Sequence, residues 1–508
     1  DVVGLAVLDA HAIVSQVGLG LAVSVWETKL GPWGLAVVVG IRWRTPCCIL
    51  ILPSFSRAGP VGRGASLADA TDCRRMGNYA LAKRLLRDSG ERNVISSIGP
   101  AGEMRLKSAS IQTTSPDGIP SRAAARGGLG AVMGAKGLKA FVVFKQGKVA
   151  RPIADPDSFM KTSKHFAAAI KRDGWSGRVL PEYGTASILV NTDASGALPT
   201  RNARQGSFEG ADRINGDTVA HTIRQRGGKT THKGCSQCII NCSNVYVDAS
   251  GKPITSALEY ETLWSMGART GIDDLDAIAR LDFLCDDIGL DTMNTGVALA
   301  VAMDAGIIRF GDAQAAVDMV ASVAQGTSMG RLIGHGPEAV GKHLNHSRVP
   351  TIKGQSIAGY DPRAMPGMGV NYATSPMGGD HTAGFVGAAS GSIDTLRNAS
   401  KSSQVHMAAT DSMGLCMFAQ SGGMENLFRA ISAMIGKPLD SQAWQQLGTR
   451  ILTAEIDFNR RAGLRDKDDR LPDMFHKESL SPQYGTVPYP ENDLHGTFAA
   501  IRQTLEEQ

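Results

Sequence analysis

Three closely spaced cysteines are the strongest chemical signal in the sequence. Cys235, Cys238 and Cys242 form a Cys-x2-Cys-x3-Cys run. Three thiolates with this spacing can hold one face of a cuboidal iron–sulfur cluster, and a fourth must come from elsewhere in the chain. Cys416, which ends the motif Asp-Ser-Met-Gly-Leu-Cys, is the best candidate for that fourth ligand. We therefore predict one [4Fe–4S] cluster on these four residues.

A zinc site is the main alternative for the same cysteines, because zinc sites also use Cys-x2-Cys pairs. Zinc normally requires a second close pair of cysteines or histidines, and none follows the run; His232 precedes it. An iron–sulfur cluster is therefore the favoured interpretation. The chain has eight cysteines in 508 residues, which is too sparse for the disulfide framework of a small secreted protein.

Two Asp-x-x-Gly-Leu motifs, at residues 286–291 and 411–416, form a second chemical signal. Either motif alone is typical of a helix end, with the glycine in the left-handed conformation. Their repetition, with Cys416 ending the second copy, favours a ligand site. A carboxylate beside exposed backbone N–H groups suits a flat heterocycle that is rich in N–H donors and carries a phosphate tail.

Taken together, these motifs resemble those of the tungsten-containing aldehyde:ferredoxin oxidoreductase family. The cysteine run, with a fourth cysteine closing the second motif, is similar to the cluster arrangement of that family. Residues 122–136 resemble its glycine-rich cofactor loop, and residues 259–264, 360–363, 372–375 and 468–472 are also similar to family segments. The resemblance extends from about residue 76 to near the C-terminus.

The resemblance implies a cofactor in which two pterins hold tungsten or molybdenum, with Mg²⁺ bridging the pterin phosphates. Arginines of the glycine-rich loop would donate charge-assisted hydrogen bonds to those phosphates. By itself this loop would be interpreted as a turn between strands, because it matches neither the dinucleotide-binding nor the Walker pattern. The candidate pterin-binding residues are Arg122, Ala123, Ala125, Arg126, Asp286, Gly289, Leu290, Asp291, Asp411, Gly414, Leu415 and Met417.

The resemblance also implies the reaction: oxidation of an aldehyde or related carbonyl to a carboxylate, with electrons passing through the cluster to ferredoxin or a similar carrier. Such a reaction needs a carboxylate to manage a proton and a group to orient the carbonyl. Glu261 is the first candidate for the carboxylate, Glu259 is the alternative, and His381 is the candidate for the second role. The competing hypothesis is a non-catalytic iron–sulfur electron-transfer protein, or a degraded family member without a complete cofactor site.

Two positions depart from the pattern of the resembled family. Ala383 stands where some members have a lysine contact, and Arg280 stands where some have a glutamate that binds a bridging iron between subunits. No mononuclear iron is therefore predicted. The resemblance further implies a cytoplasmic homo-oligomer.

The fold class predicted from the sequence is α+β, a partial β-rich pterin-saddle domain followed by two mainly helical domains. Residues 1–72 are set apart as an anomalous segment, attributed to truncation or a frame-shifted reading. The remainder of the pterin-binding domain is expected at residues 73–155. Helical domains are expected at 156–355, with the cysteine run and the first Asp-x-x-Gly-Leu motif, and at 356–508, with the second motif.

Apolar spacing locates the main elements of these domains. It predicts helices at residues 78–89, 157–172, 275–288, 294–306, 312–325 and 442–460, and strands at 93–98 and 139–145. Net charge is +5 with basic residues dispersed along the chain, so nucleic acid is not the expected partner. Charged residues interrupt the apolar N-terminal stretch, so no membrane span is predicted.

Overall fold

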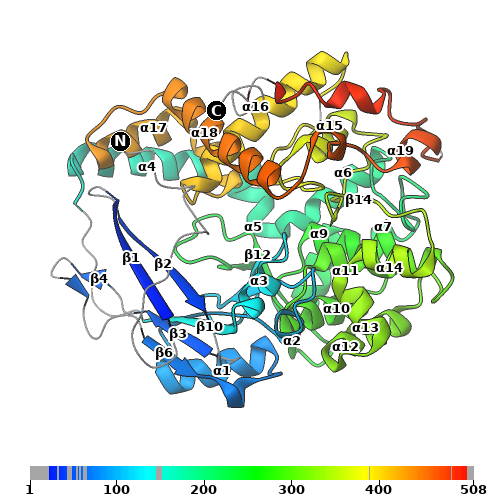
Figure 1. The fold of residues 1–508 in the computed structure, drawn as a ribbon, viewed down its shortest axis with the longest axis horizontal. Helices are drawn as coiled ribbons and strands as arrows, with labels where there is room; N and C mark the ends of the chain where they lie inside the picture. Colours follow the sequence, from blue (N-terminus) through cyan, green and yellow to red (C-terminus); the bar gives the residue numbers. More distant parts are fainter. Residues whose placement is uncertain are drawn as a thin grey trace. The chain divides into compact units, whose positions relative to one another are not determined.

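The computed structural model describes residues 22–30, 34–42, 48–52, 55–56, 59–60, 66–144, 152–387, 389–481, 483–499 and 501. These residues belong to two compact units (Figure 1). The first comprises residues 1–165, 286–289 and 425–439, and the second comprises residues 166–285, 290–424 and 440–508.

A six-stranded sheet in the order β6-β3-β10-β7-β8-β9 organises the first unit. Strand β10 pairs parallel to β3 and antiparallel to β7. Helix α1, Asn78–Ser89, buries Leu81 and Leu85 against Ile95 and Val142 of the sheet. The strands are β3 Cys48–Leu52, β6 Ser66–Asp69, β7 Val94–Ser97, β8 Ile111–Thr113, β9 Arg122–Ala124 and β10 Leu138–Val143; two hairpins pair β1 Ala22–Leu30 with β2 Gly34–Arg42 and β4 Phe55–Ser56 with β5 Gly59–Pro60.

The glycine-rich loop of the first unit leads from β9 into a short helix, α3, Leu129–Ala135. Glycines allow this helix to lie close to other backbone: a Cβ atom at Gly130 would collide with the Ser110 carbonyl, and one at Gly134 with the carbonyl of Gly102 in α2, Pro100–Glu103. The loop is thus a strand-to-helix connection, whereas the sequence alone suggested a turn between strands. The unit also contains most of α4, Pro156–Arg172, and of α17, Met424–Ile435.

The second unit is mainly helical, with a three-stranded sheet and one two-stranded pair. The strands are β11 Lys229–His232, β12 Ser243–Val247, β13 Pro253–Thr255, β14 Thr351–Ile352 and β15 Gln355–Ser356. The α-helices are α5 Leu180–Tyr183, α6 Ile188–Ala194, α7 Ala211–Ile214, α8 Gly216–Gln225, α9 Tyr260–Thr262, α10 Leu275–Ile288, α11 Thr292–Asp304, α12 Ala313–Gln325, α13 Ser328–His335, α14 Pro337–Leu344, α15 Pro366–Thr374, α16 Ile393–Ser412, α18 Ser441–Arg461 and α19 Asp473–Lys477.

The helices expected from apolar spacing occur with nearly the expected bounds, as α1, α4, α10, α11, α12 and α18. Several helices were not predicted from the sequence, among them α8, α13, α14, α15, α16 and α17. Helix α15 lies inside a stretch interpreted only as rich in Gly and Pro, and α16 is rich in Ser, Thr and Asn, which gives it little amphipathic signal. Helix α16 matters for function because the second Asp-x-x-Gly-Leu motif begins within it.

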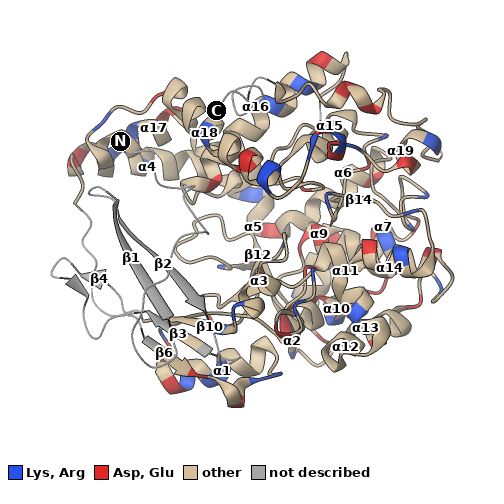
Figure 2. Ribbon diagram, in the orientation of Figure 1, with Lys and Arg blue, Asp and Glu red and all other residues tan. Residues whose placement is uncertain are grey.

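Charged residues of both signs are interspersed over the described elements, as Figure 2 shows. Among the described residues, no helix is both long and apolar enough to cross a membrane.

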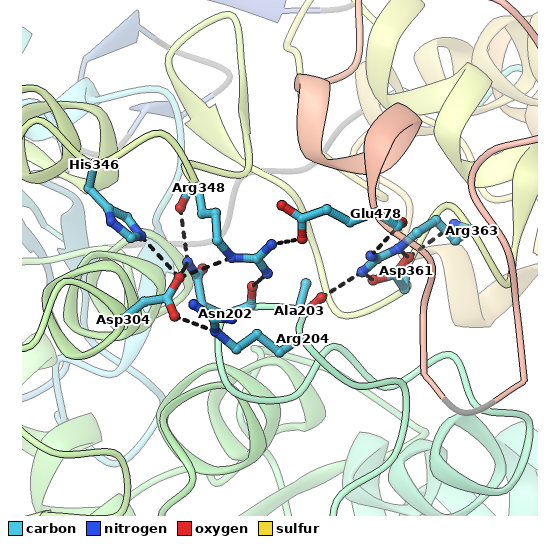
Figure 3. Close-up of polar contacts among 9 residues, drawn as sticks. All are labelled: Asn202, Ala203, Arg204, Asp304, His346, Arg348, Asp361, Arg363 and Glu478. Carbon is cyan, nitrogen blue, oxygen red and sulfur yellow. Dashed lines mark hydrogen bonds and ion pairs between the residues drawn. The ribbon is translucent and has the colours of Figure 1, made fainter.

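A buried network of ion pairs centres on Asp304 and Asp361 in the second unit (Figure 3). Asp361 accepts two hydrogen bonds from Arg363, at 2.9 Å from Nε and 2.7 Å from Nη2, and both side chains are fully buried. Asp304 is paired with Arg348 and Arg204, at 3.0 and 2.5 Å. Burial opposes ionisation of Asp304, but hydrogen bonds from its partners hold its pKa below the usual value.

The same network holds backbone from distant parts of the second unit. Arg363 donates to the carbonyl oxygens of Ala203, at 2.6 Å, and Glu478, at 3.2 Å. Arg348 donates to the carbonyl oxygen of Asn202 at 3.1 Å. Loops separated by more than one hundred residues in sequence are therefore held together by buried guanidinium groups.

Substituting Arg363 by Met would leave the Asp361 carboxylate buried without its ion-pair partner. Breaking one side of such a pair costs about 3–5 kcal/mol of folding free energy, so Arg363→Met is expected to unfold at markedly lower denaturant concentration. Arg224→Met is the matched control, because Arg224 and Glu182 form a pair at 3.0 Å whose side chains are about half exposed. That control should change stability by less than about 1 kcal/mol; equal effects in both variants would contradict this assignment.

Candidate active site

The cysteine run forms the connection between β11 and β12. Gln237 and Asn241 adopt left-handed backbone conformations, with φ of 60° and 59°, which turn the chain sharply around the run. The N–H of Asn241 donates to the sulfur of Cys238 at 3.4 Å. Backbone folded in this way directs amide groups toward a thiolate, as a bound cluster requires.

Cys416 joins the run through the short helix η7, Met417–Gly422, which follows it directly. Phe418 and Ala419 of this helix pack with Cys238 and Cys242 around the buried side chain of Ile240. Burial raises the pKa of the Cys242 thiol, and the nearby charges of Glu259, Cys416, Cys238 and Cys235 raise it further. All four predicted ligands therefore lie within electrostatic reach of one another.

The four thiols fit an iron–sulfur cluster by the chemistry of their donor set. All four are free of disulfides, and Cys235 and Cys416 are exposed. Among the described residues, no group of three or more His, Cys, Asp or Glu side chains converges closely enough to hold a single metal ion. A cuboidal cluster bonds each thiolate to a different iron, so it does not require that convergence. Its iron ions would also offset the repulsion among the thiolates.

Glu261 and His381, far apart in sequence, meet in the structure. The distance from His381 Nε2 to Glu261 Oε1 is 3.3 Å, and the side chains are only 14% and 17% exposed. Glu261 lies in α9, and His381 lies in the loop between α15 and α16. The other ring nitrogen of His381, Nδ1, is buried without a hydrogen-bond partner among the described residues. A carboxylate and an imidazole in this arrangement can share or transfer a proton.

Aromatic rings fix the position of this pair. The ring of Tyr360 lies 5.7 Å from that of His381 and 5.4 Å from that of Tyr260, the residue before Glu261. The hydroxyl of Tyr260 donates to the carbonyl oxygen of Gly359 at 2.5 Å. Burial, with a contribution from the charge of Glu261, raises the pKa of Tyr360 well above its usual value, so its hydroxyl remains protonated. Gly359 contacts Tyr260, the neighbour of Glu261, and Tyr360 contacts His381. Residues 359–360 therefore touch both sides of the Glu261–His381 pair.

Glu259, the alternative carboxylate, has a different environment. It precedes α9, and one of its oxygens accepts a hydrogen bond from Thr185 Oγ1 at 2.5 Å. The same threonine oxygen accepts the N–H of Tyr260 at 3.0 Å, so Thr185 satisfies a backbone donor at the start of α9. Glu259 also lies near Cys242, whose pKa it raises. The structure thus places Glu259 on the side of the cysteine run and Glu261 against His381.

The second Asp-x-x-Gly-Leu motif ends helix α16. Gly414 has a φ of 68°, and its N–H donates to the carbonyl oxygen of Asp411 at 2.9 Å. Burial and the charge of Asp380 raise the pKa of Asp411. Because Asp380 is the neighbour of His381, the second motif lies within electrostatic reach of the loop that carries the histidine. Leu415 and Met417 flank Cys416 in this same turn.

The first motif also ends a helix, α10, with Gly289 at a φ of 78°. The Gly289 carbonyl accepts the N–H of Ser110 at 3.0 Å, and the Asp286 carbonyl accepts the side chain of Asn78 at 2.8 Å, all within the first unit. Asp291 is 1% exposed and caps α11, because its side chain accepts the N–H of Met293 at 2.9 Å. These structural roles account for the motif locally, and its contact with a pterin, including that of Leu290, stays a prediction.

The candidate residues of the glycine-rich loop differ in exposure. Arg122 and Ala123 lie in β9 at the edge of the six-stranded sheet, and Ala123 is exposed. Ala125 is partly buried, and Arg126 is only 7% exposed. Their roles in binding phosphate stay predictions.

Three residues that shape the site were not identified from the sequence: Thr185, Tyr360 and Asp380. The available signals were that Tyr360 lies in segment 360–363, which resembles the family, and that Asp380 directly precedes the candidate His381. Thr185 had none, because its contact with the start of α9 joins residues far apart in sequence.

Comparisons with known proteins identify the family to which the chain is similar. The sequence model described as "Aldehyde ferredoxin oxidoreductase, domains 2 & 3" matches residues 161–496. The model of the N-terminal domain of the same family matches residues 47–145, so family-like sequence reaches into the segment set apart as anomalous.

Individual relatives point to the same family. The chain is 32% identical over 448 residues to the tungsten-containing aldehyde ferredoxin oxidoreductase of Pyrococcus furiosus, which covers 82% of this chain and 70% of that protein. It is 32% identical to the Thermococcus kodakarensis protein of the same name, over 81% of this chain and 69% of that protein. An aliphatic sulfonate oxidoreductase, WOR-like subunit, of P. furiosus is 24% identical over 87% of this chain and 73% of that protein.

A solved structure shares the fold. The active site complex BamBC of benzoyl coenzyme A reductase, in complex with 1,5-dienoyl-CoA, superimposes with a TM-score of 0.70 at 16% identity, over 96% of this chain and 85% of that chain. This likeness confirms the α+β fold class expected from the sequence.

The matched family models and relatives define the class of this chain, an oxidoreductase. The chain belongs to the aldehyde ferredoxin oxidoreductase family, as both family models and the relatives show. This confirms the resemblance drawn from the sequence motifs. Membership implies a tungsten–pterin cofactor and an iron–sulfur cluster.

Thr185 offers a test of how α9 is held in place. Thr185→Val removes the hydroxyl that accepts the N–H of Tyr260 and donates to Glu259. Leaving buried polar groups without partners costs about 1–3 kcal/mol, so the variant should unfold at lower denaturant concentration. Thr185→Ser, which keeps the hydroxyl, is the matched control and should restore most of that stability. A serine variant as unstable as the valine variant would show that the methyl group, and not the hydrogen bonds, matters here.

Proposed function

We propose that the protein oxidises an aldehyde or related carbonyl to a carboxylate and passes the electrons through one [4Fe–4S] cluster to ferredoxin or a similar carrier. The contact between Glu261 and His381, 3.3 Å apart, is the observation that carries the proposal. Its setting near the cysteine run supports it, because Glu259, two residues before Glu261, lies within electrostatic reach of Cys242.

Oxidation of an aldehyde with water yields a carboxylate, protons and two electrons. A tungsten–pterin group, when bound, supplies the acceptor for those two electrons. The chain supplies the proton chemistry: Glu261 takes the proton that is released, and His381, whose Nε2 faces that carboxylate, orients the carbonyl oxygen. The surrounding rings of Tyr260, Tyr360 and Phe385 exclude water and hold both groups in place.

The four cysteines would hold the iron–sulfur cluster, which when bound supplies one-electron transfer to the carrier. Cys416 supports this route, because it directly follows the turn whose Asp411 is expected to bind pterin. The two arginines of the glycine-rich loop would hold pterin phosphates, with Mg²⁺ bridging them.

Glu261→Gln tests the catalytic assignment. The substitution keeps the size of the side chain but removes its ability to take a proton, so tungsten, pterin and iron should stay bound while aldehyde oxidation falls by about 10²-fold or more. Glu259→Gln is the matched control, because that residue contacts Thr185 instead of His381. Full activity in Glu261→Gln, or a comparable loss only in Glu259→Gln, would remove Glu261 from the mechanism.

Cys416→Ala tests the fourth cluster ligand. Wild-type protein purified without oxygen should contain about four irons per chain, and the variant should lose much of this iron and its visible absorption. Cys285→Ala is the control, because Cys285 is buried in α10, forms no disulfide and does not belong to the cysteine run. Unchanged iron in Cys416→Ala would show that the fourth ligand is a different residue.

Metal analysis of the wild-type protein separates this proposal from a non-catalytic iron–sulfur protein. Tungsten or molybdenum with pterin and iron supports the oxidoreductase. Iron without pterin, or zinc alone, would contradict it.

A further inference from the structure

Arg269 is a fully buried cation that lacks a hydrogen-bond partner in the part of the chain that the structure describes. It lies in the short helix η6, Ala268–Thr270, and its exposed fraction is 0%. None of its three guanidinium nitrogens has a hydrogen-bond partner among the described residues. Its guanidinium carbon lies 5.7 Å from the ring centre of Trp264, a contact that supplies no hydrogen-bond acceptor. Leaving a guanidinium in this state is costly, because desolvation is not repaid by any bond.

The carboxylates nearest to Arg269 already form ion pairs with other arginines. Arg269 interacts electrostatically with Asp361 and Asp304, but Asp361 pairs with Arg363, and Asp304 pairs with Arg348. Arg348 and Arg363 are themselves close enough to disfavour the charge on Arg269.

The buried centre of this network therefore has three guanidinium groups, Arg269, Arg348 and Arg363, for two carboxylates, those of Asp304 and Asp361. The partly exposed Arg204, paired with Asp304, and Glu478, paired with Arg348, add one charge of each sign and leave the balance unchanged. One positive charge is left over inside the protein. Burial lowers the pKa of Arg269 to about 9, so at neutral pH it still carries that charge.

Backbone hydrogen bonds fix the main chain at Arg269. The N–H groups of Arg201 and Asn202 donate to the carbonyl oxygens of Ala268 and Arg269, both at 3.1 Å. Arg201, Asn202 and Ala203 are three successive residues with left-handed φ angles of 43°, 55° and 59°. Such a conformation is unfavourable for residues other than glycine and persists only where surrounding contacts impose it. The segment around Arg269 is thus held at both carbonyls.

We propose that Arg269 binds a small monovalent anion, of the size of chloride, that completes the buried charge network. An anion satisfies the donors and also balances the surplus charge, whereas a water molecule would provide only an acceptor. The site is structural and is separate from the proposed catalytic pair. It does not depend on the proposed function.

The test compares stability in two salts at equal ionic strength. The holoenzyme as purified is depleted of halide and heated in sodium gluconate or sodium chloride, because gluconate is too large for a buried site. An anion that binds only the folded state stabilises it, so the apparent Tm should rise on the order of 2 °C in chloride. Crystals grown in sodium bromide should show an anomalous scattering peak within hydrogen-bond distance of the Arg269 guanidinium.

Variants assign the effect to this residue. Arg269→Met removes the surplus charge, so its Tm should be the same in both salts, with no bromide peak. Arg204→Met is the control, because Arg204 belongs to the same network but is half exposed, and its salt dependence should match the wild type. Equal Tm values for the wild type in the two salts, or a bromide-free site in the crystal, would overturn the proposal. Both measurements use wild-type protein, so they decide the matter even if Arg269→Met does not fold.

Discussion

The mainly helical unit depends on one constraint, that the buried carboxylates of Asp304 and Asp361 must both be paired with guanidinium groups. Buried ion pairs contribute little net stability, but a missing partner is strongly destabilising. Loops 201–204, 346–348 and 361–363, the end of α11 and residue 478 must therefore reach their positions together (Figure 3). The network thus determines which segments contact one another, and it contributes little to the net free energy of folding.

The proposed catalytic geometry follows from this constraint. Arg363 holds the side chain of Asp361, and the residue before Asp361, Tyr360, packs against both Tyr260 and His381. Trp264, three residues after Glu261 in the chain, is held by a hydrogen bond from its indole nitrogen to the Pro199 carbonyl at 3.1 Å. Both members of the Glu261–His381 pair are thus adjacent to residues that the buried network or its neighbouring loop holds in place.

The two Asp-x-x-Gly-Leu motifs show that a helix end and a ligand site are compatible interpretations. Gly289 and Gly414 both adopt left-handed backbone at the end of a helix, but their surroundings differ. A Cβ atom at Gly289 would lie 2.9 Å from the backbone nitrogen of Gly99, whereas the space around Gly414 is open. The open turn is the one that leads to Cys416, which suits a motif expected to serve both cofactors.

The sequence by itself determined the local chemistry: the Cys-x2-Cys-x3-Cys spacing, the left-handed glycines and the amphipathic helices α1, α10 and α18. Each depends on residues close together in the chain, so periodicity and spacing suffice. Only the tertiary structure decided that Glu261 faces His381 while Glu259 faces Thr185, and that Arg269 finds no hydrogen-bond partner among the described residues. These facts arise from contacts between segments far apart in sequence. A pattern along one chain contains no information about which buried charges will find each other.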